Sequence, residues 1–170
     1  MEIAIDQGPL VAHKIAALRT GALLTDPDAF GELHGKAAAR TAQEWVDWLA
    51  SLANGCDRQI FVWKRDDEYL AMCGAGIDRE APEQGFIWGV YVVPPWRGRG
   101  GAEALMNTAH AWLAGRGVRR IVAKVAAPNL VAVRFYRRLG YRIGPPDGVL
   151  LPESTVPVHT ITRELAPPQH

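Results

Sequence analysis

Apolar residues recur along the chain with two different spacings, and each spacing predicts one kind of element. A helical period predicts helices from Leu10 to Leu24, from Thr41 to near Asn54, from Gly100 to Arg116 and from Asn129 to Leu139. Shorter runs of β-branched and aromatic residues predict strands from Gln59 to Lys64, Tyr69 to Ile77, Phe86 to Val93 and Arg120 to Ala126, then from Tyr141 onward and from Val156 to Leu165.

Residues typical of helix ends and turns support these boundaries. Thr41 and Glu44 stand three positions apart, which is the pattern of a capping box at a helix start. Asn129 is a suitable N-cap, and Gly140 suits the position just after a helix. The polar stretch from Arg65 to Glu68 separates the first two strands, which are therefore expected to form a hairpin.

The strand from Phe86 to Val93 is the most apolar of the predicted strands. Its nearly continuous apolar character predicts burial on both faces, at the centre of a sheet. Gly89 interrupts it, which indicates a bulge or a close backbone approach. The strand–helix–strand unit from Phe86 to Ala126 is expected to be a right-handed parallel crossover. The whole order predicts an α/β chain with a mixed sheet, in a single domain over residues 1–170.

Composition narrows the class of protein. The 170 residues are 48% apolar and 22% charged, as in ordinary globular proteins, and the net charge of +1 gives no reason to expect nucleic acid or a membrane as a partner. Cys56 and Cys73 do not make a secreted disulfide framework, and the scattered histidines lack metal-ligand spacing. There is no signal-peptide pattern and no apolar run near the ~18 residues of a membrane span, so the expected location is cytoplasmic.

A glycine-rich turn carries the first chemical signal. From Trp96 to Leu105 the chain passes from the apolar strand into a helix, so several backbone N–H groups meet at the positive end of a helix dipole. Such a turn can bind a phosphate or diphosphate, and glycines let the ligand approach the backbone. A Walker A loop is excluded because no Gly-Lys-Ser/Thr is present. A dinucleotide fingerprint is disfavoured because Glu103 stands where its third glycine belongs.

Two motifs together resemble the signatures of the GNAT superfamily of acetyltransferases. The first is R/Q-x-x-G-x-G/A, whose fixed positions are Arg97, Gly100 and Ala102. The second is N-x-x-A-x-x-F-Y-x-x-x-G-F/Y, which the stretch NLVAVRFYRRLGY from Asn129 to Tyr141 fits. The resemblance covers residues 59–145 well, and the region around Arg19, Asp26, Phe30 and Trp45 more loosely.

The resemblance implies a fold and a donor. The fold is a central, mostly antiparallel twisted sheet with a parallel splayed pair, flanked by helices. The donor is acetyl-CoA, used without a metal. By position, backbone groups of Val90 and Val92 would pair with the pantetheine arm, and an amide near Val90 or Tyr91 would hold the oxyanion. The diphosphate would lie on Arg97, Gly98, Arg99, Gly100, Gly101 and Ala102.

Two further residues match family positions. Asn129 matches a position that bonds the pantetheine arm, and Tyr136 matches a tyrosine that protonates the departing thiolate as general acid. A role as a core aromatic on a helix is the alternative for Tyr136 and the preferred interpretation for Phe135. Trp88 is the best candidate to line an acceptor pocket, because its strand borders the thioester.

Several questions stay open at this point. The general base is Asp78, Glu80 or Glu83, in the loop before the central strand, or water. The implied reaction is transfer to a primary amine of a small molecule or protein. The alternatives are a non-catalytic acyl-CoA-binding regulatory module and a transferase for a bulkier acyl group.

Homodimers are common in the family, but no interface is identifiable. His110 is expected at a surface or edge, and Gly101 is expected to weaken the packing of its helix or to loosen the loop.

Overall fold

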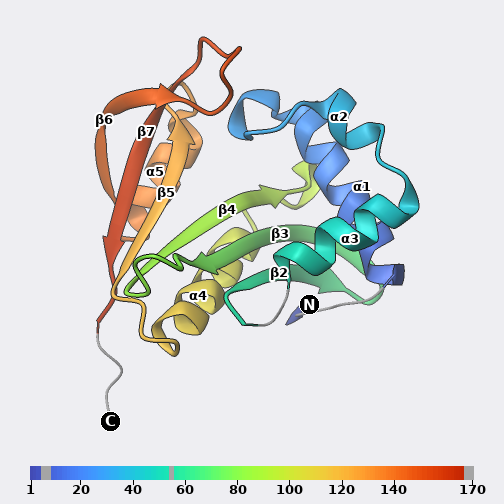
Figure 1. The fold of residues 1–170 in the computed structure, drawn as a ribbon, viewed down its shortest axis with the longest axis horizontal. Helices are drawn as coiled ribbons and strands as arrows, with labels where there is room; N and C mark the ends of the chain where they lie inside the picture. Colours follow the sequence, from blue (N-terminus) through green and yellow to red (C-terminus); the bar gives the residue numbers. More distant parts are fainter. Residues whose placement is uncertain (5–8, 54–55, 167–170) are drawn as a thin grey trace.

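A seven-stranded sheet carries helices on both of its faces (Figure 1). The computed structural model describes residues 1–4, 9–53 and 56–166. The strands are β1 (Glu2–Ala4), β2 (Arg58–Arg65), β3 (Glu68–Ile77), β4 (Gln84–Val92), β5 (Arg120–Ala126), β6 (Arg142–Val149) and β7 (Pro157–Glu164). The helices are α1 (Pro9–Thr25), α2 (His34–Ala38), α3 (Ala42–Leu52), α4 (Gly101–Ala114) and α5 (Leu130–Arg138), with short 3₁₀ turns η1 (Pro27–Ala29) and η2 (Pro94–Trp96).

The sheet divides into two parts that meet at one short parallel contact. The strand order is β1-β2-β3-β4-β5-β7-β6, and every neighbouring pair is antiparallel except β4 and β5. That parallel ladder covers only residues 84–86 of β4 and 120–122 of β5. Beyond it, β4 stays with β3 while β5 stays with β7, so the two strands diverge (Figure 1).

Alternation along the strands sends side chains into two separate apolar clusters. Phe61 of β2 and Cys73 of β3 belong to the cluster under α4 and α5. Val62 and Met72, their neighbours in sequence, belong to the cluster under α1, α2 and α3. Helix α4 buries four apolar side chains at helical spacing, those of Leu105, Met106, Ala109 and Leu113. The sheet is therefore the middle of three layers, with α4 and α5 on one face and α1 to α3 on the other (Figure 1).

The predicted fold class, helices and strands are confirmed, together with the local signals that bounded them. Thr41 Oγ1 accepts from the Glu44 N–H, and the Glu44 carboxylate accepts from the Thr41 N–H, which completes the capping box. Asn129 Oδ1 accepts from the Ala132 N–H at 3.1 Å. The end of the α3 helix predicted near Asn54 lies outside the described residues; the helix itself ends at Leu52.

The expected burial of the central strand on both faces is wrong for the structure. Strand β4 is central, but Phe86 and Trp88 are only half-buried because the face that carries them borders a cavity. The short elements β1 and α2 were not predicted. Three strand residues and five helical residues are too few to show a period. Among the described residues, none of the helices combines the length and apolar character that a membrane crossing needs.

His110 lies inside the core, so the expectation that it sits at a surface or edge is wrong. Arg163 Nη1 lies 2.8 Å from His110 Nδ1, and the Tyr141 hydroxyl lies 2.7 Å from Nε2. Because a guanidinium can only donate, Nδ1 is the acceptor, and the neutral ring donates from Nε2 to Tyr141. Burial, assisted by the charge of Arg163, lowers the pKa of His110 to about 4.

This buried histidine makes stability depend on pH. The pKa of His110 is 6.5 in a free side chain and about 4 in the fold, so the unfolded chain binds more protons between these values. Stability is therefore lost as the pH falls through this window, and the free energy of unfolding is expected to drop by about 2 kcal/mol between pH 7 and pH 5. Urea unfolding at pH 7 and at pH 5 measures this difference in the free energy of unfolding. His110→Gln should reduce the drop by that amount, and an unaltered drop in this variant would contradict the assignment.

Gly101 tightens the packing of α4, so the expectation that it weakens the packing of this helix is wrong. It is buried, and a Cβ at this position would lie 2.3 Å from Trp63 Cε3. The missing side chain lets the indole of Trp63, from β2, pack against the first turn of α4. The same indole contacts Trp96 edge-on, with ring centroids 5.9 Å apart. Two tryptophans thus fix the glycine-rich turn on the sheet.

Candidate functional site

Strand β4 contains the predicted bulge at Gly89. Trp88 pairs with Gly74 and Tyr91 pairs with Met72, so two residues of β4 face one residue of β3. Gly89 has a φ of +62°, a left-handed conformation that glycine adopts without steric cost.

The bulge changes which residues of β4 face each side of the sheet. Before it, Trp88 faces α1 and α3 while Ile87 packs in the α4 cluster. After it, Tyr91 faces α1 and α3 while Val90 packs in the α4 cluster. Side chains three apart, rather than two apart, therefore share a face across the bulge.

Beyond the bulge, backbone groups of β4 point into the gap left by β5. The Val93 N–H donates to Leu70 O at 2.9 Å, so this residue points toward β3, and Tyr91 points the same way by alternation. Val90 and Val92 therefore point the other way, where the β5 ladder has already ended. These are the two residues expected to bind pantetheine.

The turn before α4 presents a row of unpaired donors. Gly98 and Gly100 have φ of +73° and +84°, and a Cβ on either would meet nothing within 4 Å. The first helical hydrogen bond runs from the Ala104 N–H to Gly100 O. In the described part of the chain, the N–H groups of residues 98–103 have no acceptor, and no side chain caps the helix. These donors surround an open, positively polarised position that suits a diphosphate.

The two arginines of this turn have partners within the protein. Arg97 Nε donates to Val92 O at 3.0 Å, and its Nη2 lies 2.6 Å from a carboxylate oxygen of Asp26. It therefore ties the corner between α1 and η1 to the glycine-rich turn before α4. The guanidinium of Arg99 stacks on Trp96, 4.8 Å from the ring centroid, and remains exposed beside the turn.

Asn129 lies between the end of β5 and the start of α5, as the N-cap of that helix. It lines a cavity of about 290 Å³ together with Asp26 and Pro27 on one side and Ala126 and Pro128 on the other. Its Oδ1 is used in capping α5, and its amide nitrogen has no hydrogen-bond partner among the described residues. That nitrogen is a donor available to a chain lying in the gap.

Tyr136 points from α5 into the apolar cluster that also includes Val90. Its ring packs between Phe135 and Tyr141, with centroids 5.5 and 5.2 Å away. Burial, assisted by the nearby Cys73, raises the pKa of Tyr136, so the hydroxyl stays protonated at neutral pH. Burial also raises the pKa of the Cys73 thiol to about 12, which leaves it without nucleophilic character there.

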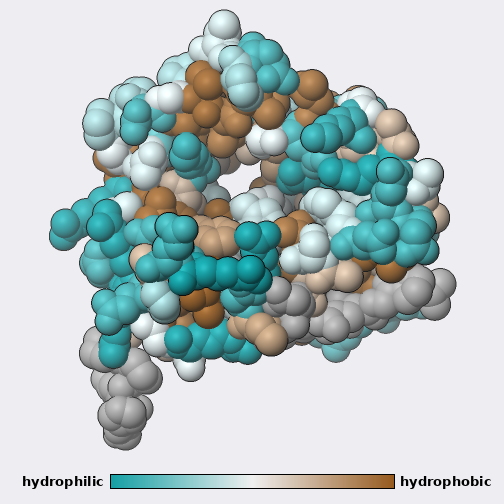
Figure 2. Space-filling model, in the orientation of Figure 1, coloured by the Kyte–Doolittle hydropathy of each residue, from teal (hydrophilic) through white to brown (hydrophobic). Residues whose placement is uncertain are grey.

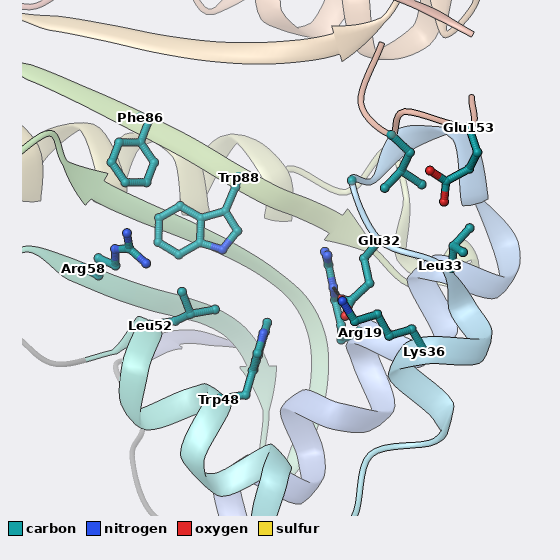
Figure 3. Close-up of a pocket in the computed structure, with 12 residues that line it drawn as sticks. Arg19, Glu32, Leu33, Lys36, Trp48, Leu52, Arg58, Phe86, Trp88 and Glu153 are labelled. Atoms are coloured by element: carbon teal, nitrogen blue, oxygen red, sulfur yellow. Dashed lines mark hydrogen bonds and ion pairs between the residues drawn. The ribbon is translucent and has the colours of Figure 1, made fainter. Parts of the chain in front are cut away.

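A second cavity, of about 470 Å³, lies on the opposite face of β4 (Figure 3). One wall of this cavity, called the aromatic cavity below, is apolar and mostly aromatic: Phe86 and Trp88 extend from β4, and Trp48 and Leu52 extend from α3 (Figure 3). The two β4 rings lie over glycines of β3, where a Cβ at Gly74 would be 2.0 Å from the Trp88 indole. Trp88 thus lines a pocket as predicted. Figure 2 shows the surface hollowed between the β5–β7 part and the helical part.

One end of this cavity carries a charged cluster that the sequence did not reveal. Glu32 receives Arg19 Nε on one carboxylate oxygen at 3.2 Å and Arg40 Nη2 on the other at 2.5 Å. Arg19 and Glu32 are each only 10% exposed in their side chains. Glu32 follows Phe30 and Gly31 directly, in a segment that resembled the family only loosely, and no motif contains it. Its role depends on contacts with α1 and the α2–α3 loop.

The three carboxylates considered as bases lie elsewhere. Asp78 caps its own loop by accepting from the Glu80 and Ala81 N–H groups. Glu80 and Glu83 are exposed in the same loop. Gln84 and Gly89 are five residue steps apart along β4, which is about 16 Å of extended strand. None of the three lines the cavity at the bulge.

Comparisons with known proteins agree with this geometry. The sequence profile described as Acetyltransferase (GNAT) family matches residues 22–141. An acetyltransferase of the GNAT family from Streptococcus pneumoniae has the same fold, with a TM-score of 0.78, 20% identity, and coverage of 97% of this chain and 100% of that one. A search of curated proteins found no significant match.

Two other similar structures were solved with ligands. The protein yncA from Salmonella typhimurium, solved with acetyl-CoA as its cofactor, gives a TM-score of 0.80 at 15% identity, covering 100% of this chain and 96% of that one. A phosphinothricin acetyltransferase from Sinorhizobium meliloti in complex with AcCoA gives 0.78 at 14% identity, covering 96% and 88%. The divergent sheet, the N–H-rich turn and the family match together define the class, and the chain belongs to the GNAT acetyltransferase family.

Proposed function

We propose that this protein transfers an acetyl group from acetyl-CoA to a primary amine, forming an amide. One observation carries the proposal: among the described residues, the N–H groups of residues 98–103 have no acceptor, and they follow closely on a strand that has no neighbouring strand on its β5 side beyond residue 86. The first feature suits a diphosphate and the second suits an extended chain that contains amides, and coenzyme A has both. Family membership and the ligands of the two similar structures support the same donor.

The residues of the gap fit this cosubstrate. The turn from Gly98 to Ala102 would hold the diphosphate, while Val90, Val92 and Asn129 would bond the pantetheine amides. Acetyl-CoA would supply an acetyl group activated as a thioester. Of the two amides considered for the oxyanion, the Val90 N–H is the one directed into the gap, since Tyr91 points toward β3.

The acceptor would approach the same point of β4 from the opposite face. The aromatic cavity reaches the bulge, because Arg19 Nη1 lies 3.6 Å from the position of a Cβ on Gly89. The neutral amine nitrogen forms a bond to the acetyl carbon, and the carbon–sulfur bond breaks. The Tyr136 hydroxyl gives its proton to the departing thiolate and later regains one from solvent.

The amine must also lose a proton. Both oxygens of Glu32 already accept from guanidinium groups, and Asp78, Glu80 and Glu83 lie at the far end of β4. We assign this proton to water in the open cavity.

The test is amine-dependent release of CoA thiol from acetyl-CoA, followed with a thiol reagent over a panel of primary amines, with mass spectrometry of the products. We expect release with at least one amine and an acetylated product. Tight acetyl-CoA binding by calorimetry without turnover of any amine would instead indicate a non-catalytic binding module. Competition by longer acyl-CoA molecules tests whether a bulkier acyl group is preferred.

A further inference from the structure

The charged end of the aromatic cavity holds an arginine with unused donors. Only 9% of the surface of Arg19 is exposed, so the residue is 91% buried. Its Nε donates to Glu32, and its guanidinium lies 4.9 Å from the centroid of the Phe30 ring. Neither Nη nitrogen has a hydrogen-bond partner within residues 1–4, 9–53 and 56–166. Both nitrogens retain access to the cavity that Arg19 lines, since neither is among the fully buried unpaired atoms.

This arrangement is costly unless something binds there. Burial lowers the pKa of Arg19, a sign that the charged form is poorly solvated, and Glu32 offsets only part of that cost. The second oxygen of Glu32 is bound by Arg40, so its single negative charge is shared between two guanidinium groups. The two Nη groups form the outer edge of a planar fork, which matches the two oxygens of a carboxylate.

The rest of the cavity indicates what kind of molecule would carry a carboxylate that binds Arg19. Phe86, Trp88, Trp48 and Leu52 make an apolar wall (Figure 3), and the cavity volume of about 470 Å³ leaves room for an aromatic ring. The lining cations are Arg19, Lys36 and Arg58, against the carboxylates Glu32 and Glu153. This balance favours a ligand with a negative group over a polyamine.

Position relative to β4 fixes where the amine would lie. Arg19 Nη1 is beside Gly89, one residue before the Val90 amide assigned to the oxyanion. A carboxylate on Arg19 would therefore lie next to the acetyl carbon. In an α-amino acid the amine is separated from the carboxylate carbon by a single carbon, so carboxylate binding at Arg19 would bring the amine to the reacting position.

We infer that the acceptor is an amino acid with an aromatic or other bulky apolar side chain, bound through its carboxylate by Arg19. This inference rests on the proposed function. Arg19 would bind the substrate directly, and Glu32 would act as a positioning residue that fixes the plane of the fork.

The experiment compares matched acceptors with and without the carboxylate: L-tryptophan against tryptamine, and L-phenylalanine against phenethylamine. For the wild-type protein we expect kcat/KM to be about 100-fold higher for the amino acids. In Arg19→Met this ratio should fall toward one, and in Arg19→Lys it should fall by about tenfold, since lysine keeps the charge but loses the fork. Arg119→Met, which removes an exposed arginine from the loop before β5, is the control and should keep the wild-type ratio.

The outcomes separate the two proposals. If amines are acetylated but the carboxylate gives no advantage, or if Arg19→Met keeps the ratio, the inference about the acceptor is overturned and the proposed function stands. If no amine is acetylated, the proposed function fails, and calorimetry of L-tryptophan with the CoA-loaded protein decides the inference alone. Binding that Arg19→Met abolishes supports it, and absence of binding to the wild type overturns it. Unchanged acetyl-CoA affinity in both Arg19 variants shows that they are folded.

Discussion

Replacing Gly100 by glutamate should abolish acetyl-CoA binding. Gly100 has a φ of +84° and immediately precedes α4, in the middle of the unpaired N–H groups of residues 98–103. A side chain there is strained by about 1–2 kcal/mol. Its carboxylate would also occupy the position polarised for a diphosphate and repel the ligand. We expect the Kd measured by calorimetry to rise by more than about 100-fold.

Gly117 offers a matched control for this substitution. It lies in the turn after α4, with a φ of +85° and nothing within 4 Å of a Cβ. Gly117→Glu therefore introduces the same charge and the same kind of strain at the other end of the helix. It should bind acetyl-CoA as the wild type does. Wild-type affinity in Gly100→Glu, or equal losses in both variants, would show that the diphosphate does not bind at this turn.

Tyr136→Phe should lower turnover by about 100-fold while acetyl-CoA affinity stays the same. The change keeps the ring that packs against Phe135 and Tyr141, and removes only the hydroxyl that would protonate the thiolate. Because burial raises the pKa of Tyr136, the hydroxyl stays in its acid form, and kcat should show no alkaline decline from this group up to pH 9. Steady-state kinetics and calorimetry together measure both quantities.

The control for this variant is the neighbouring buried tyrosine. Tyr141→Phe removes a hydroxyl that binds His110, so it should lower stability and leave turnover close to the wild-type value. A Tyr136→Phe protein with wild-type turnover would mean that Tyr136 is a core aromatic, the alternative that the sequence left open. Equal turnover losses in the two variants would point to packing rather than to proton transfer.

The sequence predicted best what depends on neighbouring residues. The turn before α4, the capping box at Thr41 and the cap at Asn129 are written in short stretches, and the structure shows each of them. The bulge at Gly89 could also be predicted, because an isolated glycine in an apolar strand usually marks a bulge or a close approach of another backbone.

Features that depend on distant residues could not be predicted. Glu32 joins the cavity only because α1 and the α2–α3 loop bring Arg19 and Arg40 to it. His110 is buried because Arg163 and Tyr141, far along the chain, satisfy both ring nitrogens. In each case the residue is polar, and its partners are separated from it by intervening elements, so no period or spacing in the sequence records the contact.

The extra residue in β4 has a consequence for how the two proposed substrates would be kept apart. In a regular strand, side chains at odd positions all lie on one face of the sheet and those at even positions on the other, along the whole strand. The bulge shifts this parity once, at Gly89, so that Trp88 faces the aromatic cavity while the backbone of Val90 opens to the gap. Deleting one residue there would exchange the sides of every position that follows. The segment would still form a strand, but the proposed donor site and acceptor site on its two sides would no longer meet at one point of the backbone.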